Sequence, residues 1–96
     1  MAHFTVRVEL HQAEWSDYEQ LHSAMEQKGF SRLITADSGS NYHLPWAEYN
    51  GTASLTSMQV LEIARAAADG TGKRNAILVT EASSRAWAGL EALVST

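Results

Sequence analysis

The sequence predicts an α+β fold in which two helices cover one face of an antiparallel sheet. The periodicity of apolar residues changes along the chain in the order strand, helix, two strands, helix, strand. Each predicted helix also opens with its own capping box, a pattern that marks where a helix begins. A chain of 96 residues can build one two-layer core, so we expect a single domain over residues 1–96.

The first strand and the first helix have clear signals. Apolar and polar side chains alternate over residues 4–10, which is the period of a half-buried strand. Ser16 and Glu19 then have the spacing of a capping box, and Gly29 supplies a left-handed stop. We therefore expect a helix over residues 16–28. Its apolar residues follow at helical spacing, namely Tyr18, Leu21 and Met25.

A hairpin is expected in the middle of the chain. Residues 30–36 and 41–54 have the character of strands, and the turn residues at 37–40 join them. Pro45 has no N–H to donate to a strand ladder, so we expect a distortion of the second strand at this point.

The second helix has the stronger start signal. Thr56 and Gln59 form a capping box, and Leu55 and Val60 flank it as a hydrophobic staple. The helix should end at Gly70 or Gly72. The predicted apolar stripe of this helix consists of Met58, Leu61, Ala64 and Ala68.

The last predicted strand covers residues 75–81. It contains an uninterrupted apolar run at 76–79, which is typical of a strand that is covered on both faces or paired at an interface. Beyond it, Trp87, Leu90 and Val94 have helical spacing and predict a short C-terminal element.

This order of elements predicts a ferredoxin-like βαββαβ sandwich, because crossovers are right-handed and both helices then lie on one face. The four strands would form one antiparallel sheet in the spatial order 4-1-3-2. The opposite face of that sheet would display polar side chains of the first strand, namely Thr5, Arg7, Glu9 and His11.

Composition excludes several classes of protein. Hydrophobic residues make up 45% and charged residues 19%, as in soluble globular proteins. The sequence has no cysteine, which excludes disulfides and thiolate chemistry. It has no signal-peptide pattern and no apolar run long enough to span a bilayer, so we expect a cytoplasmic protein without a membrane partner. The histidines lack metal-binding spacing, and we expect neither a metal nor a cofactor.

The first strand carries the best candidates for catalysis. Arg7 can stabilise developing negative charge and Glu9 can transfer a proton, although the two residues can equally form an ordinary ion pair. His11 ends the strand beside Glu9 and is the histidine best placed for proton transfer. The alternative for His11 is a plain surface role.

Two further segments are candidates for binding nucleic acid. Trp46 and Tyr49 can stack on unpaired bases, or they can fill the core. Strand alternation places Trp46 and Glu48 on one face and Tyr49 on the other, unless a bulge resets the register. Lys73 and Arg74 are the adjacent cations of the chain and can contact a phosphate backbone, although the net charge of −4 argues against a broad phosphate-binding surface.

The sequence resembles the small bacterial proteins grouped with the GhoS-type antitoxin endoribonucleases. The resemblance spans nearly the whole chain and follows four segments: residues 3–10, residues 18–32, residues 42–49 with Tyr42, Leu44, Pro45 and Glu48, and residues 73–81 with Lys73 and Arg74. It implies a ferredoxin-like fold similar to that of small CRISPR-associated nucleases. It also implies cleavage of the messenger RNA of a partner membrane toxin in a type V toxin-antitoxin system. No catalytic residue is carried over from the resemblance.

These observations together predict a protein that binds single-stranded RNA and, in the more specific form of the prediction, acts as an antitoxin endoribonuclease. His11 or Glu9 would serve as the base, and Arg7 or Arg32 as the cation. The alternative is a non-catalytic homo-oligomeric module, with a homodimer formed through Trp87 and Leu90. A sheet-face pocket for a small metabolite is a third possibility.

Overall fold

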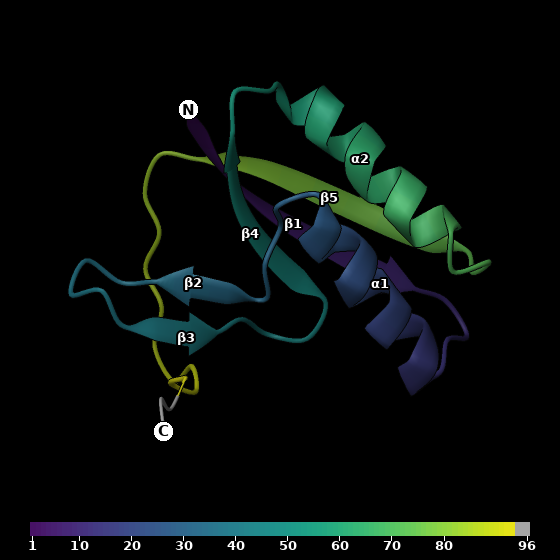
Figure 1. Cartoon of the computed structure of the whole chain (residues 1–96), viewed down its shortest axis with the longest axis horizontal. Coiled ribbons are helices and arrows are strands. Elements are labelled where there is room, and N and C mark those ends of the chain that lie inside the picture. The colour runs from purple at the N-terminus through teal and green to yellow at the C-terminus, as the bar shows by residue number, and fades with distance from the viewer. Residues whose placement is uncertain (94–96) are drawn as a thin grey trace.

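The computed structural model describes residues 1–93 of the chain (Figure 1). Over this range the elements are β1 (Ala2–Leu10), α1 (Trp15–Gln27), β2 (Leu33–Thr35), β3 (Asn41–His43), β4 (Glu48–Ala53), α2 (Ser57–Asp69) and β5 (Asn75–Ala82). The predicted α+β class with two helices is confirmed. Neither of these helices combines the length and the hydropathy that a bilayer crossing requires.

The strands form two sheets. β1 is the central strand of a three-stranded antiparallel sheet in the order β4-β1-β5, and β2 pairs with β3 in a separate two-stranded sheet. The predicted ferredoxin-like sandwich, with one four-stranded sheet in the order 4-1-3-2, is therefore wrong.

The split arises at Pro45. The strand expected over residues 41–54 is interrupted between β3 and β4, because proline offers no N–H to a ladder. Leu33 pairs with His43 of β3, whereas Ser31 pairs with Asn50 of β4. The residues between these two pairings leave the strand ladder and form a loop. The expected distortion is thus present, and it is large enough to divide the strand.

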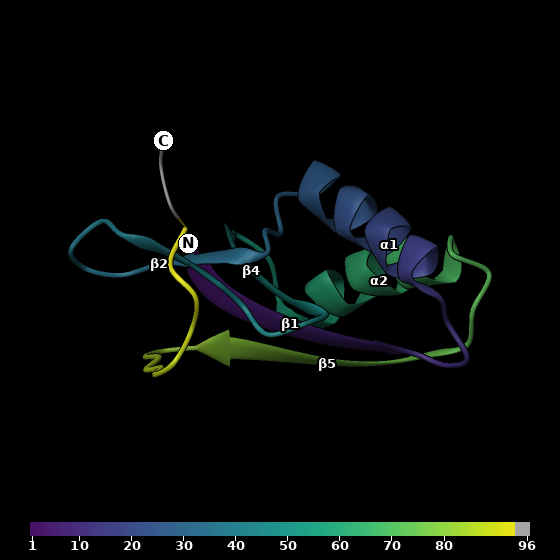
Figure 2. The ribbon, with the colours of Figure 1, turned by 90° about the horizontal axis from the view of Figure 1, so that it is seen from below.

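Both helices lie on the same face of the three-stranded sheet, as Figure 2 shows. Alternate residues of β1 are buried against this helical layer, as predicted, and the intervening Arg7 and Glu9 are exposed. The core consists mainly of Phe4, Val6, Val8 and Leu10 of β1, Leu21 and Met25 of α1, Tyr49 of β4, and Val60, Ala64 and Ala68 of α2.

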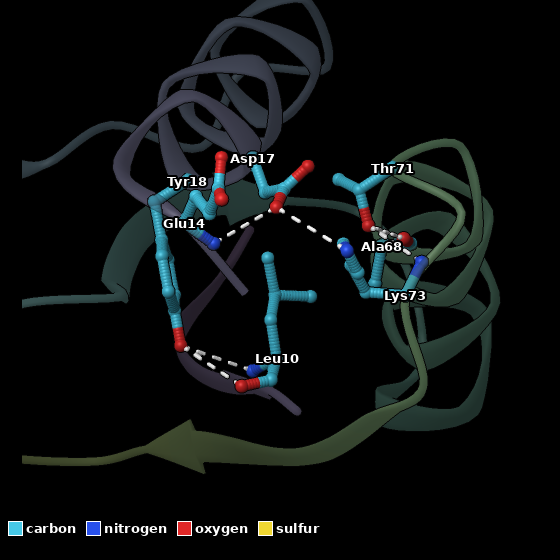
Figure 3. Close-up of polar contacts among 7 residues, drawn as sticks. All are labelled: Leu10, Glu14, Asp17, Tyr18, Ala68, Thr71 and Lys73. Atoms are coloured by element: carbon cyan, nitrogen blue, oxygen red, sulfur yellow. Dashed lines mark hydrogen bonds and ion pairs between the residues drawn. The ribbon is translucent and has the colours of Figure 1, made fainter. Parts of the chain in front are cut away.

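The first helix begins one residue earlier than predicted. Glu14 is the N-cap residue, and the Asp17 carboxylate accepts a hydrogen bond from the Glu14 N–H at 2.9 Å (Figure 3). The predicted capping box of Ser16 and Glu19 is therefore wrong, since Asp17 already occupies the N3 position and satisfies the cap. The helix ends as predicted before Gly29, whose φ is +88°.

The second helix begins as predicted. The Gln59 N–H donates to the Thr56 hydroxyl at 3.2 Å, and the Gln59 side chain accepts from the Thr56 N–H at 2.9 Å. The predicted apolar stripe of α2 is wrong at one position. Met58 is exposed, and Val60 takes the inward position because it lies four residues before Ala64.

The last strand is an edge strand that is buried on one face only. Burial alternates along β5, and Leu78 is 64% exposed on the open face opposite Arg7. The prediction that this strand is covered on both faces is therefore wrong for the single chain. The alternative, that it pairs at an interface, stays a prediction.

The C-terminal segment is extended and not helical. The His43 N–H donates to the Glu91 carbonyl at 2.8 Å, and the Leu93 N–H donates to the Asn41 carbonyl at 2.9 Å. Residues 91–93 therefore run beside β3. The helical prediction from Trp87 and Leu90 is wrong, because the free edge of β3 supplies backbone partners to an extended chain. Val94, the third residue of that pattern, lies outside the described residues.

Candidate nucleic-acid interface

A row of aromatic rings lies on one face of α1. Trp15, Tyr18 and His22 are spaced three and four residues apart, so their side chains project from the same side of the helix. The Trp46 ring packs against all three. Its centroid lies 4.7 Å from that of Trp15, 5.4 Å from that of Tyr18 and 4.9 Å from that of His22.

The two tryptophans of this row remain open to solvent. Trp15 is 65% exposed and Trp46 is 45% exposed, although the rings are stacked with an interplanar angle of 25°. Offset stacking of this kind is a favourable arrangement for aromatic pairs. We call Trp15 and Trp46 together the indole pair. Its exposure is unusual, because large aromatic side chains are highly buried on average.

Arg32 holds the loop between β3 and β4 that carries Trp46. Its Nη1 atom donates to the backbone carbonyls of Leu44, Pro45 and Glu48 at 3.2, 2.7 and 2.9 Å. The guanidinium also lies 5.6 Å from the Trp46 ring centroid, within the range of a cation–π contact. Burial lowers the pKa of Arg32 from its ordinary value. The group nevertheless stays charged, as arginine does in proteins.

The turn itself explains why Trp46 reaches α1. The Glu48 N–H donates to the Pro45 carbonyl at 3.1 Å, and Ala47 between them has a φ of +64°. A left-handed residue resets the direction of the strand. Trp46 therefore packs on the helical side, whereas Glu48 pairs with Arg7 at the sheet. Trp46 and Glu48 thus lie on opposite faces, which is the exception that the prediction allowed for a reset of the register.

Tyr49 and His22 form a polar pair beneath the rings. The Tyr49 hydroxyl lies 2.6 Å from His22 Nδ1, and the Tyr49 side chain is fully buried. Burial raises the pKa of Tyr49, which keeps its hydroxyl protonated. Burial also lowers the pKa of His22, and the charge of Arg32 lowers it further. The hydroxyl therefore donates to a neutral imidazole.

This assignment leaves one buried atom without a hydrogen-bond partner. If Nδ1 accepts, the imidazole proton resides on Nε2, which is buried and has no nitrogen or oxygen partner. The His22 and Trp46 rings meet at an interplanar angle of 82°. Edge-to-face packing of this kind is favourable for aromatic rings. His22 thereby helps to orient Trp46.

A second group of polar residues lies at one end of the three-stranded sheet. His11 Nδ1 is 3.6 Å from Glu9 Oε1, and the His11 N–H donates to the Arg74 carbonyl at 2.8 Å. His11, Lys73 and Arg74 line one open cavity of about 520 Å³. The structure thus brings His11 together with the two predicted cations, and Glu9 lies next to His11.

Tyr18 connects the two groups. Its ring contacts Trp46. Its hydroxyl accepts a hydrogen bond from the Leu10 N–H at 3.1 Å and donates one to the Leu10 carbonyl at 3.3 Å (Figure 3). Leu10 immediately precedes His11. In the same view, Lys73 Nζ lies 3.9 Å from the Asp17 carboxylate. The N-terminus of α1 therefore lies between the indole pair and the cations.

The remaining predicted residues are dispersed. Arg7 lies on the open face of the sheet, in register with Glu48 and Leu78. Arg32 lies against Trp46 and Tyr49 on the helical side, so the sheet separates it from Arg7. The four predicted catalytic residues do not form one site.

The predicted interface residues Trp87 and Leu90 are partly covered by their own chain. The Trp87 ring centroid lies 5.9 Å from that of Tyr42. Trp87 and Leu90 both line an open cavity of about 340 Å³, together with Thr5, Ile34 and Arg85. Arg85 in turn hydrogen-bonds to the Asn50 side chain. The segment therefore contributes to covering the open face of the sheet.

Sequence reasoning missed Trp15 and His22 as members of the site. Their spacing around Tyr18 was a usable signal, because three rings at intervals of three and four residues form a stripe on a helix. The position of Trp46 opposite that stripe had no such signal. It depends on the turn that Arg32 holds.

No protein-family model matches the chain, and a search of curated proteins finds no match either. The resemblance to the GhoS-type proteins therefore stays a prediction. Over residues 1–93, no three histidine, aspartate or glutamate side chains lie close enough together to hold a metal ion.

The pKa of His22 predicts a loss of stability in acid. The pKa of His22 is lower in the folded protein than its ordinary value of about 6.5. Below that pH, His22 therefore binds a proton more readily in the unfolded chain than in the folded protein. The stability that neutral His22 contributes is present above that pH and is lost as the pH falls through and below it. Urea unfolding at several pH values should show this loss in the wild type and a weaker loss in His22→Gln.

His43→Gln, which removes an exposed histidine of β3, is the matched control and should keep the loss. A free energy of unfolding that differs between wild type and His22→Gln by a constant amount at every pH would contradict the assignment.

Proposed function

We propose that the protein binds single-stranded RNA in the cytoplasm, with bases stacking on the indole pair and phosphates contacting Lys73 and Arg74. The observation that carries the proposal is the exposed, stacked arrangement of Trp15 and Trp46. Base stacking on aromatic side chains contributes roughly 1–3 kcal/mol per base and tolerates any sequence.

The rigidity of the indole pair supports this proposal. Trp46 contacts three rings of α1 and a guanidinium, so little rotational freedom remains to be lost when a base stacks on it. Binding surfaces gain affinity when their side chains are already held in the bound orientation. A tryptophan that served only to fill the core would not be 45% exposed.

The charge of the chain sets the expected character of binding. With a net charge of −4, the protein has no broad positive field, and its contacts with phosphate must be few. Each phosphate contact to a single strand changes the slope of log affinity against log salt by about −0.7. We therefore propose a binding mode with a shallow salt dependence, in which stacking supplies a large share of the affinity.

The proposal includes cleavage of the bound RNA. His11 lines the same cavity as the two cations, and its Nδ1 atom is 3.6 Å from the Glu9 carboxylate. A neutral His11 can accept the proton of a 2′-hydroxyl, whose oxygen then bonds to the neighbouring phosphorus while the bond to the 5′-oxygen breaks. The 5′-oxygen takes up a proton, and a 2′,3′-cyclic phosphate is left. A cation stabilises the additional negative charge on the phosphate.

The biological target follows from the resemblance alone. In the GhoS-type proteins the substrate is the messenger RNA of a membrane toxin, and we propose the same class of substrate for this chain. This part of the proposal needs an RNA target that contains an accessible single-stranded segment.

A second candidate function is self-association. Leu78 is 64% exposed on an eight-residue edge strand that contains no proline and no lysine. Edge strands without such protective residues readily pair with another strand. We propose a homodimer formed along β5 as the association that would cover this side chain.

Replacing either tryptophan of the indole pair should weaken RNA binding. Trp15→Ala and Trp46→Ala each remove one stacking surface, so each should reduce the binding free energy for a single-stranded RNA by about 1–3 kcal/mol. Fluorescence anisotropy of a labelled RNA measures the affinity. Trp87→Ala, the third tryptophan, is the control and should bind as the wild type does. Equal affinity in all three variants would refute the stacking surface.

Replacing His11 should abolish cleavage without abolishing binding. Loss of a general base typically lowers the rate by about 10²- to 10⁴-fold. His11→Ala should therefore leave RNA intact under conditions in which the wild type produces 2′,3′-cyclic phosphate ends. If the wild type cleaves no RNA from a varied panel, in either EDTA or Mg²⁺, the cleavage proposal fails and the binding proposal stands.

Light scattering tests the homodimer. The wild type should have twice the mass of one chain, and Leu78→Lys should be monomeric. Met58→Lys removes a side chain with the same 64% exposure from α2, so it should remain a dimer. A wild-type protein that stays monomeric at high concentration excludes the association.

A further inference from the structure

A polar groove lies between α2 and the start of β5. Its volume is about 660 Å³, and it is lined chiefly by Leu61, Arg65 and Asp69 of α2 and by Lys73, Arg74 and Asn75 of the following segment. We call it the α2–β5 groove. The predicted functional residues Lys73 and Arg74 belong to it, but Arg65 was not singled out by any sequence pattern.

Positive charge is concentrated in this groove. Three of the seven lysine and arginine residues of the chain line it. Lys73 is 3.9 Å from Asp17, whereas Arg65 and Arg74 form no ion pair with any other residue in the range 1–93. The only carboxylate of the groove lining, that of Asp69, accepts a hydrogen bond from the Asn75 amide at 2.9 Å.

The C-terminal end of α2 does not oppose an anion here as strongly as a bare helix end would. Helix C-termini are normally negative because their last carbonyls lack partners. In this helix the Thr71 hydroxyl donates to the Ala68 carbonyl at 2.6 Å (Figure 3), and the Gln20 amide donates to the Gly70 carbonyl at 3.1 Å. The Gly70 N–H also donates to the Ala66 carbonyl.

The groove is continuous with the cavity that contains His11. Both are lined by Gly72, Lys73 and Arg74. A strand that contacts Lys73 beside His11 can therefore continue between α2 and β5 until it reaches Arg65. The two guanidinium groups on this path can each hold a phosphate through two parallel hydrogen bonds.

We propose that the α2–β5 groove binds phosphate groups of the RNA strand beyond His11, with Arg74 and Arg65 as the contacting residues. This inference rests on the proposed RNA function and deepens it, because it gives the direction in which the strand leaves the indole pair. A free polyphosphate has the same chemistry and is the other possible source of the phosphates.

The test compares a short and a long RNA. A four-nucleotide RNA can cover the indole pair and His11 only, whereas a twelve-nucleotide RNA can also enter the groove. Arg65→Gln should weaken binding of the longer RNA by about 10- to 100-fold, which is typical of one hydrogen bond to a charged group, and should make its salt dependence shallower by about 0.7. Binding of the shorter RNA should not change.

Two further variants complete the design. Lys28→Gln removes an exposed cation that follows α1 and does not line the groove, so it should leave both affinities as in the wild type. Arg65→Ala introduces a stronger helix former and replaces Arg65→Gln if that variant loses its helical circular dichroism.

The outcomes separate the two proposals. If Trp46→Ala weakens both RNAs while Arg65→Gln weakens neither, the groove is refuted and the proposed function stands. If the wild type binds no RNA, the proposed function fails, and thermal unfolding with tripolyphosphate then decides the groove. If tripolyphosphate stabilises the wild type but not Arg65→Gln, the groove is retained as a site for free polyphosphate. If tripolyphosphate does not stabilise the wild type, the groove is refuted.

Discussion

The guanidinium of Arg32 is the constraint on which the candidate site depends. Proline ends the pairing of β3, and the chain that follows must satisfy its carbonyl groups without a ladder. One nitrogen of Arg32 accomplishes this by donating to the carbonyls of Leu44, Pro45 and Glu48. Because the turn is fixed, Trp46 projects toward α1 and not toward the open face of the sheet. A methionine at position 32 would have a similar length but no N–H to donate to these carbonyls.

The helix supplies the other half of the site. Its rings at Trp15, Tyr18 and His22 receive Trp46, and buried Tyr49 holds the His22 ring from below. Stability and function are linked here, since the same contacts that complete the core orient the exposed indoles. Tyr18 extends this link to the end of β1, where it hydrogen-bonds to the residue before His11. The stacking surface and the polar cluster are thus held by one helix.

Local signals predicted the elements well, and long-range pairing was the part that they could not predict. The capping box at Thr56 and the alternation of β1 depend only on residues that are close together in the sequence, and both predictions are confirmed. The division of the sheet depends on how far the chain departs from the ladder at Pro45, which no short pattern encodes. The C-terminal segment shows the same limit, because its helical spacing was overridden by a free strand edge. At the site, the sequence left open whether Trp46 is exposed or fills the core, and the role of Arg32 in the turn required the fold.

The measurement that tests this account most directly is the circular dichroism of the indole pair in Arg32→Met. Two stacked indoles couple their far-ultraviolet transitions and give a paired positive and negative signal, which Trp46→Phe should remove and so identify. We expect Arg32→Met to lose this signal while keeping its helical spectrum, because the turn then has no side-chain donor and no longer presents Trp46 to α1. An unchanged signal in Arg32→Met would contradict the claim that one guanidinium holds the site together.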